Sequence, residues 1–253
     1  MNEPQTLHEA LIVDTETTGI GSSDRMIEYA HLSLPTLEQL QAVSPIYSYD
    51  GITQLNSVWN PGVGICAEAT AVNGWTKERY AEHPPVEGFQ IETTNYIIGH
   101  NIDFDCRFIG EPTAKRICTI RLAKLAWPKT ANGVTSYKLT SLIEYFIPDG
   151  KTLVKEAHGA LADCYLTFIL LDEILKRFPR VTSWEELYQL QAPKAKEAPK
   201  KPATKLEVMP FGKYKGELFC DIPKEYLRWA LDSMDLKDNL REAMQCAYGM
   251  GGR

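Results

Sequence analysis

The sequence has little of what marks a secreted, disulfide-bonded or membrane-spanning protein. Its six cysteines lie far apart and never form a CxxC pair, which argues against a zinc ribbon and a disulfide framework. We expect reduced thiols in the core. The longest apolar stretch, 165–171, stops at Asp172, well short of the roughly 20 residues that a membrane span needs. Residues 1–7 lack the pattern of a secretory signal. We therefore expect a cytoplasmic protein with no membrane partner.

Basic residues are also fewer than acidic ones, 27 against 33, which gives a net charge of −6. By itself, this charge would disfavour a nucleic-acid partner. The distribution of charge is uneven. Residues 1–191 hold 15 basic and 24 acidic side chains, whereas 192–205 is rich in Lys and Pro and holds one Glu. We predict a first domain at 1–191, a semi-rigid linker at 192–205 and a small module at 206–253. The excess of acidic residues in the first domain would be explained if several of its carboxylates bind divalent cations, which add positive charge.

The order of apolar segments predicts an α/β fold. Three segments near the start read as antiparallel strands, and two later strands are each followed by a helix. Strands followed by alternating strands and helices are typical of one mixed sheet flanked by helices. The predicted strands are 10–13, 26–34, 41–49, 96–99 and 115–119, and the predicted helices are 104–109, 120–127, 137–146 and 160–177.

Two carboxylates end the first predicted strand. Asp14 and Glu16 are separated by Thr15, so the period-two alternation of a strand places both on one face, about 6–7 Å apart. One interpretation is a polar turn in which Asp14 caps the loop that follows. The other is a metal site, because two buried carboxylates on one face need a compensating cation.

Two further polar motifs occur later in the chain. Residues 100–105 follow the predicted strand 96–99, at the carboxyl end where open α/β sheets place their sites. Either Asp103 or Asp105 in this motif could simply cap the next helix. The third motif pairs His158, in a loop, with Asp163, in the first turns of the long helix. A single histidine in such a place is more often structural.

Taken in order, the three motifs resemble the DEDD exonuclease superfamily. Residues 14–19, Asp-Thr-Glu-Thr-Thr-Gly, match its first motif, and Gly-His-Asn at 99–101 with Phe104 and Asp105 matches its second. His158 lies five residues before Asp163, as in the DEDDh or DnaQ-like branch, whereas the tyrosine branch needs Tyr where this chain has Gly159. Residues 117–128 and the tail at 209–229 are most similar to the exodeoxyribonuclease X group. Residues 71–76 depart from the family pattern.

The resemblance implies a ribonuclease H-like, mixed five-stranded sheet flanked by helices and a small α+β module at the C-terminus. It also implies a metal-dependent 3′–5′ exodeoxyribonuclease that releases 5′-mononucleotides from single-stranded or frayed 3′ ends of DNA. Two Mg²⁺ ions, or Mn²⁺, would be held by four carboxylates, and a histidine would take a proton from the attacking water. The implied residues are Asp14, Glu16, Asp105 and Asp163 for the metals and His158 for the base.

Substrate contacts are predicted around these motifs. Thr17, Thr18 and Asn101 are candidates for hydrogen bonds to the terminal nucleotide. Trp75, Phe104 or Phe108 could stack on its base, although aromatic side chains are more often core. A basic stretch could follow the phosphate backbone or be a solvated face, and 213–215 could contact phosphate or form a structural hairpin. The basic stretch comprises Lys115, Arg116, Arg121, Lys124, Lys129 and Lys138.

Other functions remain as hypotheses at this point. An RNA-directed enzyme of the same branch differs only in contacts to the 2′-hydroxyl, which the sequence does not place. A proofreading subunit would need a polymerase partner, in contrast to a free-standing DNA repair enzyme, and the C-terminal module could bind a protein. An inactive nuclease-fold adaptor would be expected to lack a metal ligand or the base, and this chain keeps all of them.

Overall fold

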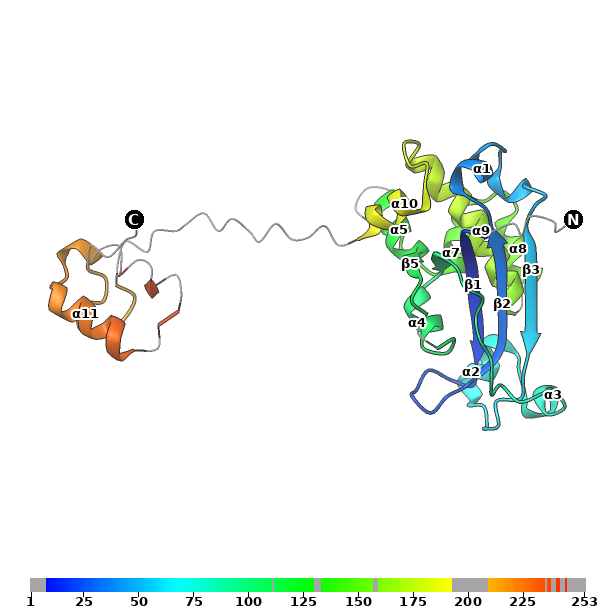
Figure 1. Ribbon diagram of the computed structural model, residues 1–253, viewed down its shortest axis with the longest axis horizontal. Coiled ribbons are helices and arrows are strands. Elements are labelled where there is room, and N and C mark those ends of the chain that lie inside the picture. The colour runs from blue at the N-terminus through cyan, green and yellow to red at the C-terminus, as the bar shows by residue number, and fades with distance from the viewer. Residues whose placement is uncertain are drawn as a thin grey trace, which may run out of the picture. The chain divides into compact units, whose positions relative to one another are not determined.

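The computed structural model describes residues 8–110, 112–129, 133–156, 159–192 and most of 209–244. Within the last range the described residues are 209–234, 236–237, 240–241 and 244, and the side chains of Glu156 and Cys220 are not included. The chain divides into two compact units, 1–192 and 193–253, which are described separately (Figure 1). The predicted base, His158, and all of the predicted linker except Ala192 lie outside the described residues.

The first unit is built on a five-stranded mixed sheet in the order β3-β2-β1-β4-β5. β1 pairs antiparallel with β2 and parallel with β4, while β2–β3 is antiparallel and β4–β5 parallel. The predicted mixed five-stranded sheet is therefore confirmed. The strands are β1 (Ala10–Thr17), β2 (Met26–Leu34), β3 (Thr53–Val58), β4 (Tyr96–Gly99) and β5 (Lys115–Cys118).

Alternation along β1 separates two apolar cores. Ala10 and Ile12 belong to the larger core, whereas Leu11 and Val13 belong to a smaller core on the opposite face. A strand contributes to both cores only when helices or loops cover both faces of its sheet. β1 is such a strand, so any polar group at its end is held by a rigid central element.

Helices cover both faces of the sheet (Figure 1). The long helix α9 packs across β1 and β2 together with α5 and α7, and α4 packs against β1, β4 and β5. The helices of this unit are α1 (Leu37–Gln41), α2 (Ala67–Asn73), α3 (Lys77–Tyr80), α4 (Ile102–Cys106), α5 (Thr119–Ala126), α7 (Leu139–Phe146), α8 (Gly150–Glu156), α9 (Ala160–Arg177) and α10 (Trp184–Gln191), with a 3₁₀ turn at Ile46–Ser48.

The predicted third strand at 41–49 is wrong. That region contains the end of α1 and the 3₁₀ turn, and the third strand is β3, at Thr53–Val58. Thr36 and Gln39 form a capping box that starts α1, which favours a helix there. β3 lies at the edge of the sheet, and four of its six residues are exposed. It therefore has no apolar alternation from which it could be predicted.

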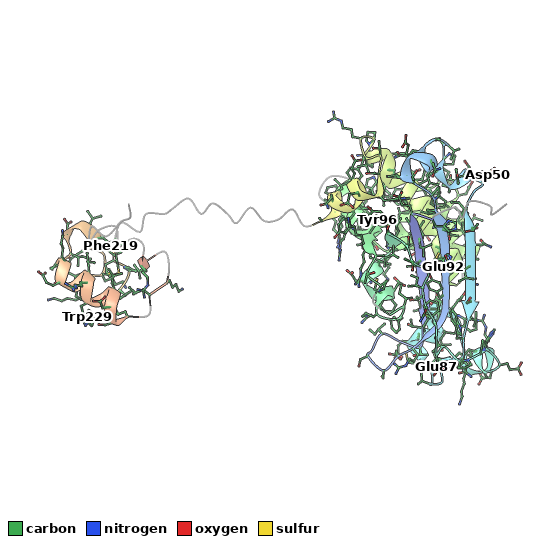
Figure 2. All side chains as sticks on the ribbon, viewed as in Figure 1. Asp50, Glu87, Glu92, Tyr96, Phe219 and Trp229 are labelled. Atoms are coloured by element: carbon green, nitrogen blue, oxygen red, sulfur yellow. The ribbon has the colours of Figure 1, made fainter. Side chains whose placement is uncertain are left out.

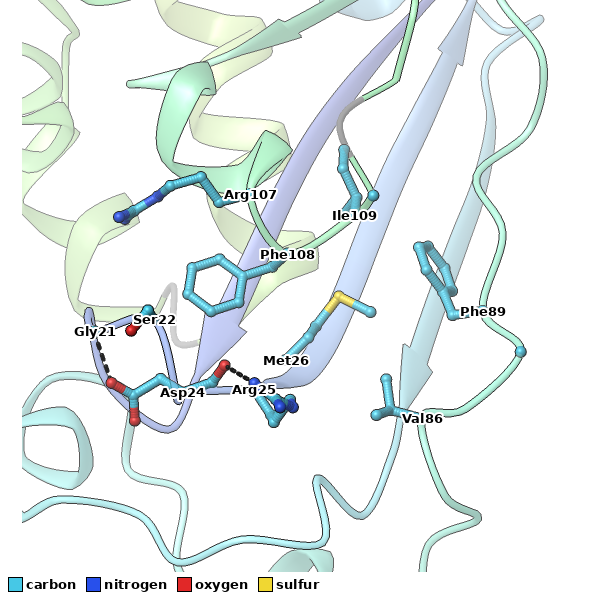
Figure 3. A pocket seen from close by; sticks show the side chains of 12 residues that line it. Gly21, Ser22, Asp24, Arg25, Met26, Val86, Phe89, Arg107, Phe108 and Ile109 are labelled. Atoms are coloured by element: carbon cyan, nitrogen blue, oxygen red, sulfur yellow. Dashed lines mark hydrogen bonds between the residues drawn. The ribbon is translucent and has the colours of Figure 1, made fainter.

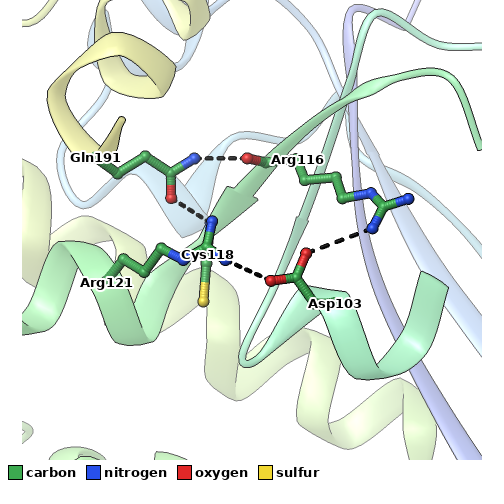
Figure 4. Close-up of polar contacts among 5 residues, drawn as sticks. All are labelled: Asp103, Arg116, Cys118, Arg121 and Gln191. Carbon is green, nitrogen blue, oxygen red and sulfur yellow. Dashed lines mark hydrogen bonds and ion pairs between the residues drawn. The ribbon is translucent and has the colours of Figure 1, made fainter. Parts of the chain in front are cut away.

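The other edge of the sheet, β5, is covered by a side chain of α10. Gln191 accepts a hydrogen bond from the Cys118 N–H at 2.7 Å and donates one to the Arg116 carbonyl at 2.5 Å (Figure 4). An amide side chain thus takes the place of a sixth strand along two backbone groups. This arrangement protects an edge that could otherwise pair with another chain.

The second unit has its own small core around α11 (Lys224–Ser233) and a 3₁₀ turn at Phe219–Asp221. Helical spacing in the sequence predicts that Tyr226, Trp229, Ala230, Leu240 and Met244 form the core of a two-helix module, and Ala230, Leu240 and Met244 are indeed buried. The prediction that Trp229 belongs to this core is wrong, because its side chain is 50% exposed (Figure 2). Trp229 packs beside Tyr226, with the two ring centres 5.5 Å apart.

Of the four cysteines whose side chains are described, three lie in the core as predicted. Cys106, Cys118 and Cys164 are buried thiols, while Cys66 is an exposed one. Among the described residues, the structure contains no helix that combines the length and the apolar character needed to cross a membrane.

Candidate active site

Three carboxylates meet where β1 ends and α9 begins. Asp14 and Glu16 lie on the β1 face that α9 covers, and Asp163 lies in the first turn of α9. One carboxylate oxygen from each of the three lies within 4.8 Å of the other two. All three side chains are partly exposed, so the cluster is open to a ligand. The first and third sequence motifs are thus brought together by the packing of α9 on the sheet.

Asp105 reaches the same place from α4. Its side chain is 3% exposed, and its Oδ1 accepts hydrogen bonds from the Thr15 N–H at 3.0 Å and from the Thr15 hydroxyl at 2.8 Å. Thr15 lies between Asp14 and Glu16, and alternation turns its side chain to the α4 face of the sheet. The middle residue of the first motif therefore orients the carboxylate of the second.

The closely spaced carboxylates of the cluster repel one another electrostatically. Burial, followed by the charges of Asp105, Asp163 and Glu16, raises the pKa of Asp14 well above its ordinary value. Burial also raises the pKa of Asp105 to about 7, although its hydrogen bonds from Thr15 lower that pKa. The free-energy cost of ionising such crowded carboxylates is offset when a cation binds between them.

The pKa of Glu16 is raised in part by Glu28, a residue outside the three motifs. Burial, followed by the charges of Asp163 and Glu28, raises the pKa of Glu16 to about 8, and a hydrogen bond from the Asn73 side chain lowers it. Glu28 lies directly opposite Glu16 in the β1–β2 ladder and is 6% exposed. The indole N–H of Trp75 donates a 3.1 Å hydrogen bond to its carboxylate.

Glu28 and Asn73 are the two residues of this region that the sequence reasoning missed. Glu28 is the charged residue in a strand that is buried throughout, and this is a signal that the sequence contains. Its position opposite Glu16 follows only from the register of the antiparallel pair. Asn73 donates to the Thr17 carbonyl at 3.1 Å, and it belongs to the segment that departs from the family pattern. No motif could have identified it.

The donor set fits a hard divalent cation. It consists entirely of carboxylate oxygens, the ligands that Mg²⁺ and Mn²⁺ prefer over nitrogen or sulfur. The nearby thiol of Cys164 is directed elsewhere, toward the backbone carbonyls of Ile12 and Ala30 at 3.7 and 3.5 Å. Burial and the surrounding carboxylates raise the pKa of this thiol, so it stays protonated and does not compete as a ligand.

The contact between Thr15 and Asp105 leads to a testable prediction. Thr15→Val removes the hydroxyl but keeps the shape and strand preference of the side chain, so the fold should be retained. We expect the substitution to lower metal-dependent turnover about 10–100-fold, the usual effect of losing a group that orients a metal ligand. Thr15→Ser keeps the hydroxyl and should retain most of the activity. Equal activity of the Val and Ser variants would contradict this role.

Thr17, Thr18 and Asn101 lie around the cluster. The Thr17 hydroxyl donates to the Gly19 carbonyl at 2.7 Å, and the Thr18 hydroxyl donates to Asp24 at 2.9 Å. Both hydroxyls are therefore engaged within the loop, and their role toward a nucleotide stays a prediction. Asn101 precedes α4 in a left-handed conformation with φ of 80°, which Asn tolerates better than most residues. Its side chain is exposed.

Two of the three predicted aromatic platforms, Trp75 and Phe104, differ in exposure. Trp75 is only 7% exposed and packs with Ile27 and Tyr80, so its ring forms part of a small core beside the site. Phe104 is partly exposed, lies 5.1 Å from the Phe108 ring and precedes Asp105 directly. Phe104 is thus the better placed of the two to meet a base. Stacking by either residue stays a prediction.

The alternatives left open for Asp103 and the basic stretch are resolved in part. Asp103 pairs with Arg116 at 3.4 Å and with Arg121, away from the acid cluster (Figure 4). Lys115 similarly pairs with Glu185 at 2.5 Å. The other three lysines, Lys124, Lys129 and Lys138, line a hollow of about 530 Å³ around Tyr137. Half of the stretch is therefore committed to ion pairs, and the rest forms a basic surface.

Comparison with known proteins supports the interpretation of this site. The chain is 25% identical over 233 residues to Exodeoxyribonuclease 10 of Escherichia coli K12, covering 88% of this chain and 91% of that protein. It is also 25% identical over 191 residues to the Uncharacterized exonuclease CP81 of Escherichia phage 186, covering 66% of this chain and 89% of that protein. Over most of its length the chain is thus similar in sequence to exonucleases.

Solved structures of exonucleases share the fold. A structure of Exonuclease X in complex with 5′ overhanging duplex DNA matches with a TM-score of 0.52 and 23% identity, over 72% of this chain and 99% of that one. A structure of E. coli Exonuclease I in complex with a dA16 oligonucleotide matches with a TM-score of 0.50 and 19% identity, over 72% of this chain and 42% of that one. A separate family model, described as "Putative quorum-sensing-regulated virulence factor", matches residues 203–250 alone.

Proposed function

We propose that the protein is a metal-dependent 3′–5′ exodeoxyribonuclease that releases 5′-mononucleotides from single-stranded or frayed 3′ ends. The observation that carries this proposal is the cluster of Asp14, Glu16 and Asp163 oxygens within 4.8 Å, joined by Asp105 through Thr15. Carboxylates crowded in this way gain from binding cations, and a pair of cations is suited to phosphodiester hydrolysis.

The four carboxylates would hold two Mg²⁺ or Mn²⁺ ions. When bound, such ions supply positive charge that makes a water more acidic and offsets the charge on the phosphate and the leaving 3′ oxygen. The protein's own task is to fix the ligands before the substrate arrives. The buried β1 strand holds Asp14 and Glu16, Thr15 holds Asp105, and the first turn of α9 holds Asp163.

His158 is proposed as the general base of the reaction. Its ordinary pKa of about 6.5 leaves the imidazole mostly neutral near neutral pH, so it can take a proton from the attacking water while the bond between phosphorus and the 3′ oxygen breaks. The support for this role is its position in the chain. It directly precedes Gly159, whose Cβ position would lie 3.2 Å from a carboxylate oxygen of Glu28, beside Glu16.

DNA is proposed as the substrate for two reasons. The relative with 91% coverage is named an exodeoxyribonuclease, and two solved structures that share the fold are complexes with DNA. On this chain, Lys124 and Lys129 lie 5.7 and 5.8 Å from the Tyr137 ring, so the basic hollow pairs cations with an aromatic face. That combination suits a phosphate backbone and its bases.

The decisive experiment is degradation of a 5′-labelled single-stranded DNA oligomer by the full-length protein. We expect a ladder that shortens from the 3′ end with Mg²⁺ or Mn²⁺ and stays intact with EDTA. A parallel 3′-labelled oligomer should release its label as a mononucleotide in the first cycles. A ribo-oligomer of the same sequence should be degraded more slowly.

Three results would contradict the proposal. Release of the 5′ label as a mononucleotide would show that degradation runs from the 5′ end. Equal degradation in EDTA would show that hydrolysis does not require a metal ion. Faster loss of the ribo-oligomer would point to an exoribonuclease of the same branch. Each result changes a different element of the proposal.

A further inference from the structure

A cavity separate from the acid cluster lies beside the β1–β2 loop. It has a volume of about 490 Å³ and is bounded by this loop, the segment that follows α4 and residues 86–89 (Figure 3). Its size falls within the range of about 300–1,000 Å³ that is usual for small-molecule sites. We call it the loop–helix cavity. Its lining includes Ser22, Asp24, Arg25, Phe89, Arg107 and Phe108.

The charge of this cavity is unusual for an acidic domain. Arg25 and Arg107 are exposed in its wall, and among the described residues of the lining the one acid is Asp24. Both carboxylate oxygens of Asp24 already accept hydrogen bonds, one from the Thr18 hydroxyl at 2.9 Å and the other from the Gly21 N–H at 2.7 Å. Figure 3 shows the bond to Gly21. The cavity therefore has a cationic rim whose own carboxylate is engaged elsewhere.

Arg107 is the side chain best placed to bind a ligand there. Its guanidinium carbon lies 4.8 Å from the Phe104 ring centre and 5.6 Å from that of Phe108. Within the described part of the chain, no hydrogen bond or ion pair engages its N–H groups. A guanidinium that is oriented by aromatic rings but has no anion partner suits a phosphate or a base edge.

Two contacts join the wall of the cavity to residues that neighbour the acid cluster in the chain. Phe108 lies 5.1 Å from Phe104, which directly precedes Asp105. On the other wall, Asp24 bonds Thr18, next to the end of β1. A DNA strand with its terminal phosphodiester at the acid cluster would therefore have the loop–helix cavity within reach of nearby nucleotides.

We propose that the loop–helix cavity is an accessory nucleotide site, which takes one base with its phosphate from the DNA outside the nucleotide being hydrolysed. Arg107 binds the phosphate or base edge, and Phe108 offers its ring to the base. The nucleotide comes either from the hydrolysed strand or from an unpaired part of the complementary strand. This proposal rests on the proposed DNA exonuclease function.

The test uses two variants of the full-length protein, each with a matched control. Arg107→Ala removes the guanidinium, and Arg180→Ala removes an exposed guanidinium outside the cavity. Ser22→Leu fills the cavity, and Ser23→Leu adds the same side chain to the neighbouring exposed residue. Binding to labelled single-stranded DNA and to a duplex with a 5′ overhang is measured in EDTA. Hydrolysis of the p-nitrophenyl ester of thymidine 5′-monophosphate, a single nucleotide, is measured with Mn²⁺.

We expect Arg107→Ala and Ser22→Leu to weaken DNA binding at least about 5-fold, the lower end of what one stacked base contributes. Both should hydrolyse the single-nucleotide ester at the wild-type rate, because that substrate has no second nucleotide. Weaker binding of both DNAs identifies the hydrolysed strand as the source, and weaker binding of the overhang duplex alone identifies the complementary strand. DNA affinities equal to those of the two controls would overturn the proposal.

Failure of the proposed function would look different. If the wild-type protein hydrolyses neither the ester nor DNA, the exonuclease assignment is lost. The binding comparison between the cavity variants and their controls still decides whether the cavity takes a nucleotide.

Discussion

Asp14→Asn should abolish turnover and at the same time stabilise the metal-free protein. The variant loses one ligand charge from the cluster, so we expect kcat/KM to fall by at least about 1,000-fold, which corresponds to about 4 kcal/mol of transition-state stabilisation. Burial and four neighbouring carboxylates raise the pKa of Asp14 well above its ordinary value, and this raised pKa costs folding free energy at neutral pH. A neutral amide of the same shape removes that cost.

The two effects are measured on the same preparation. Turnover is followed on single-stranded DNA with Mg²⁺, and the Tm is recorded in EDTA. We expect the Tm to rise by about 2–4 °C for each kcal/mol gained. Asp50→Asn, which changes an exposed carboxylate outside the cluster, should alter neither quantity. Wild-type turnover of the Asp14→Asn protein would refute the role of Asp14 as a metal ligand. A lower Tm in EDTA would show that the charge of Asp14 does not destabilise the metal-free protein.

The stability of the metal-free protein should fall as the pH rises from about 5 to about 8. The pKa of Glu16 is raised to about 8 and that of Asp105 to about 7, whereas both groups titrate near 4 in an unfolded chain. Between these values the folded protein holds protons that the unfolded chain releases, so unfolding becomes more favourable as the pH rises. The stabilising contribution is complete below about pH 4 and is lost as the pH passes through 7 and 8.

Divalent cations should reverse this trend, because they replace the protons on the same oxygens. We expect the Tm in EDTA to decrease from pH 5 to pH 8, and the increase in Tm on adding Mg²⁺ to be larger at pH 8. Glu16→Gln should flatten both dependences, while Glu82→Gln, an exposed change, should leave them as in the wild type. A Tm in EDTA that rises over this range, or a Mg²⁺ effect independent of pH, would contradict the coupling.

Much of the site could be predicted from the sequence because its ligands come from local patterns. Asp14 and Glu16 share a face through strand alternation, and Asp163 occupies the first turn of a helix whose bounds, 160–177, the apolar pattern predicted correctly. The choice between Asp103 and Asp105 needed the structure. Two residues apart on a helix, they point to different sides, so that packing turns Asp105 toward Thr15 and Asp103 toward Arg116 and Arg121.

By itself, then, the sequence determined four of the five strands, the long helix α9 and the identity of the acids, since these depend on periodicity and residue type. Tertiary structure decided what depends on register and on neighbours distant in the chain. It placed Glu28 opposite Glu16, moved the third strand to the exposed residues 53–58, and buried Trp75 against Glu28. It also formed the loop–helix cavity from three segments. No local pattern encodes these features, because each requires two segments to meet only after the chain has folded.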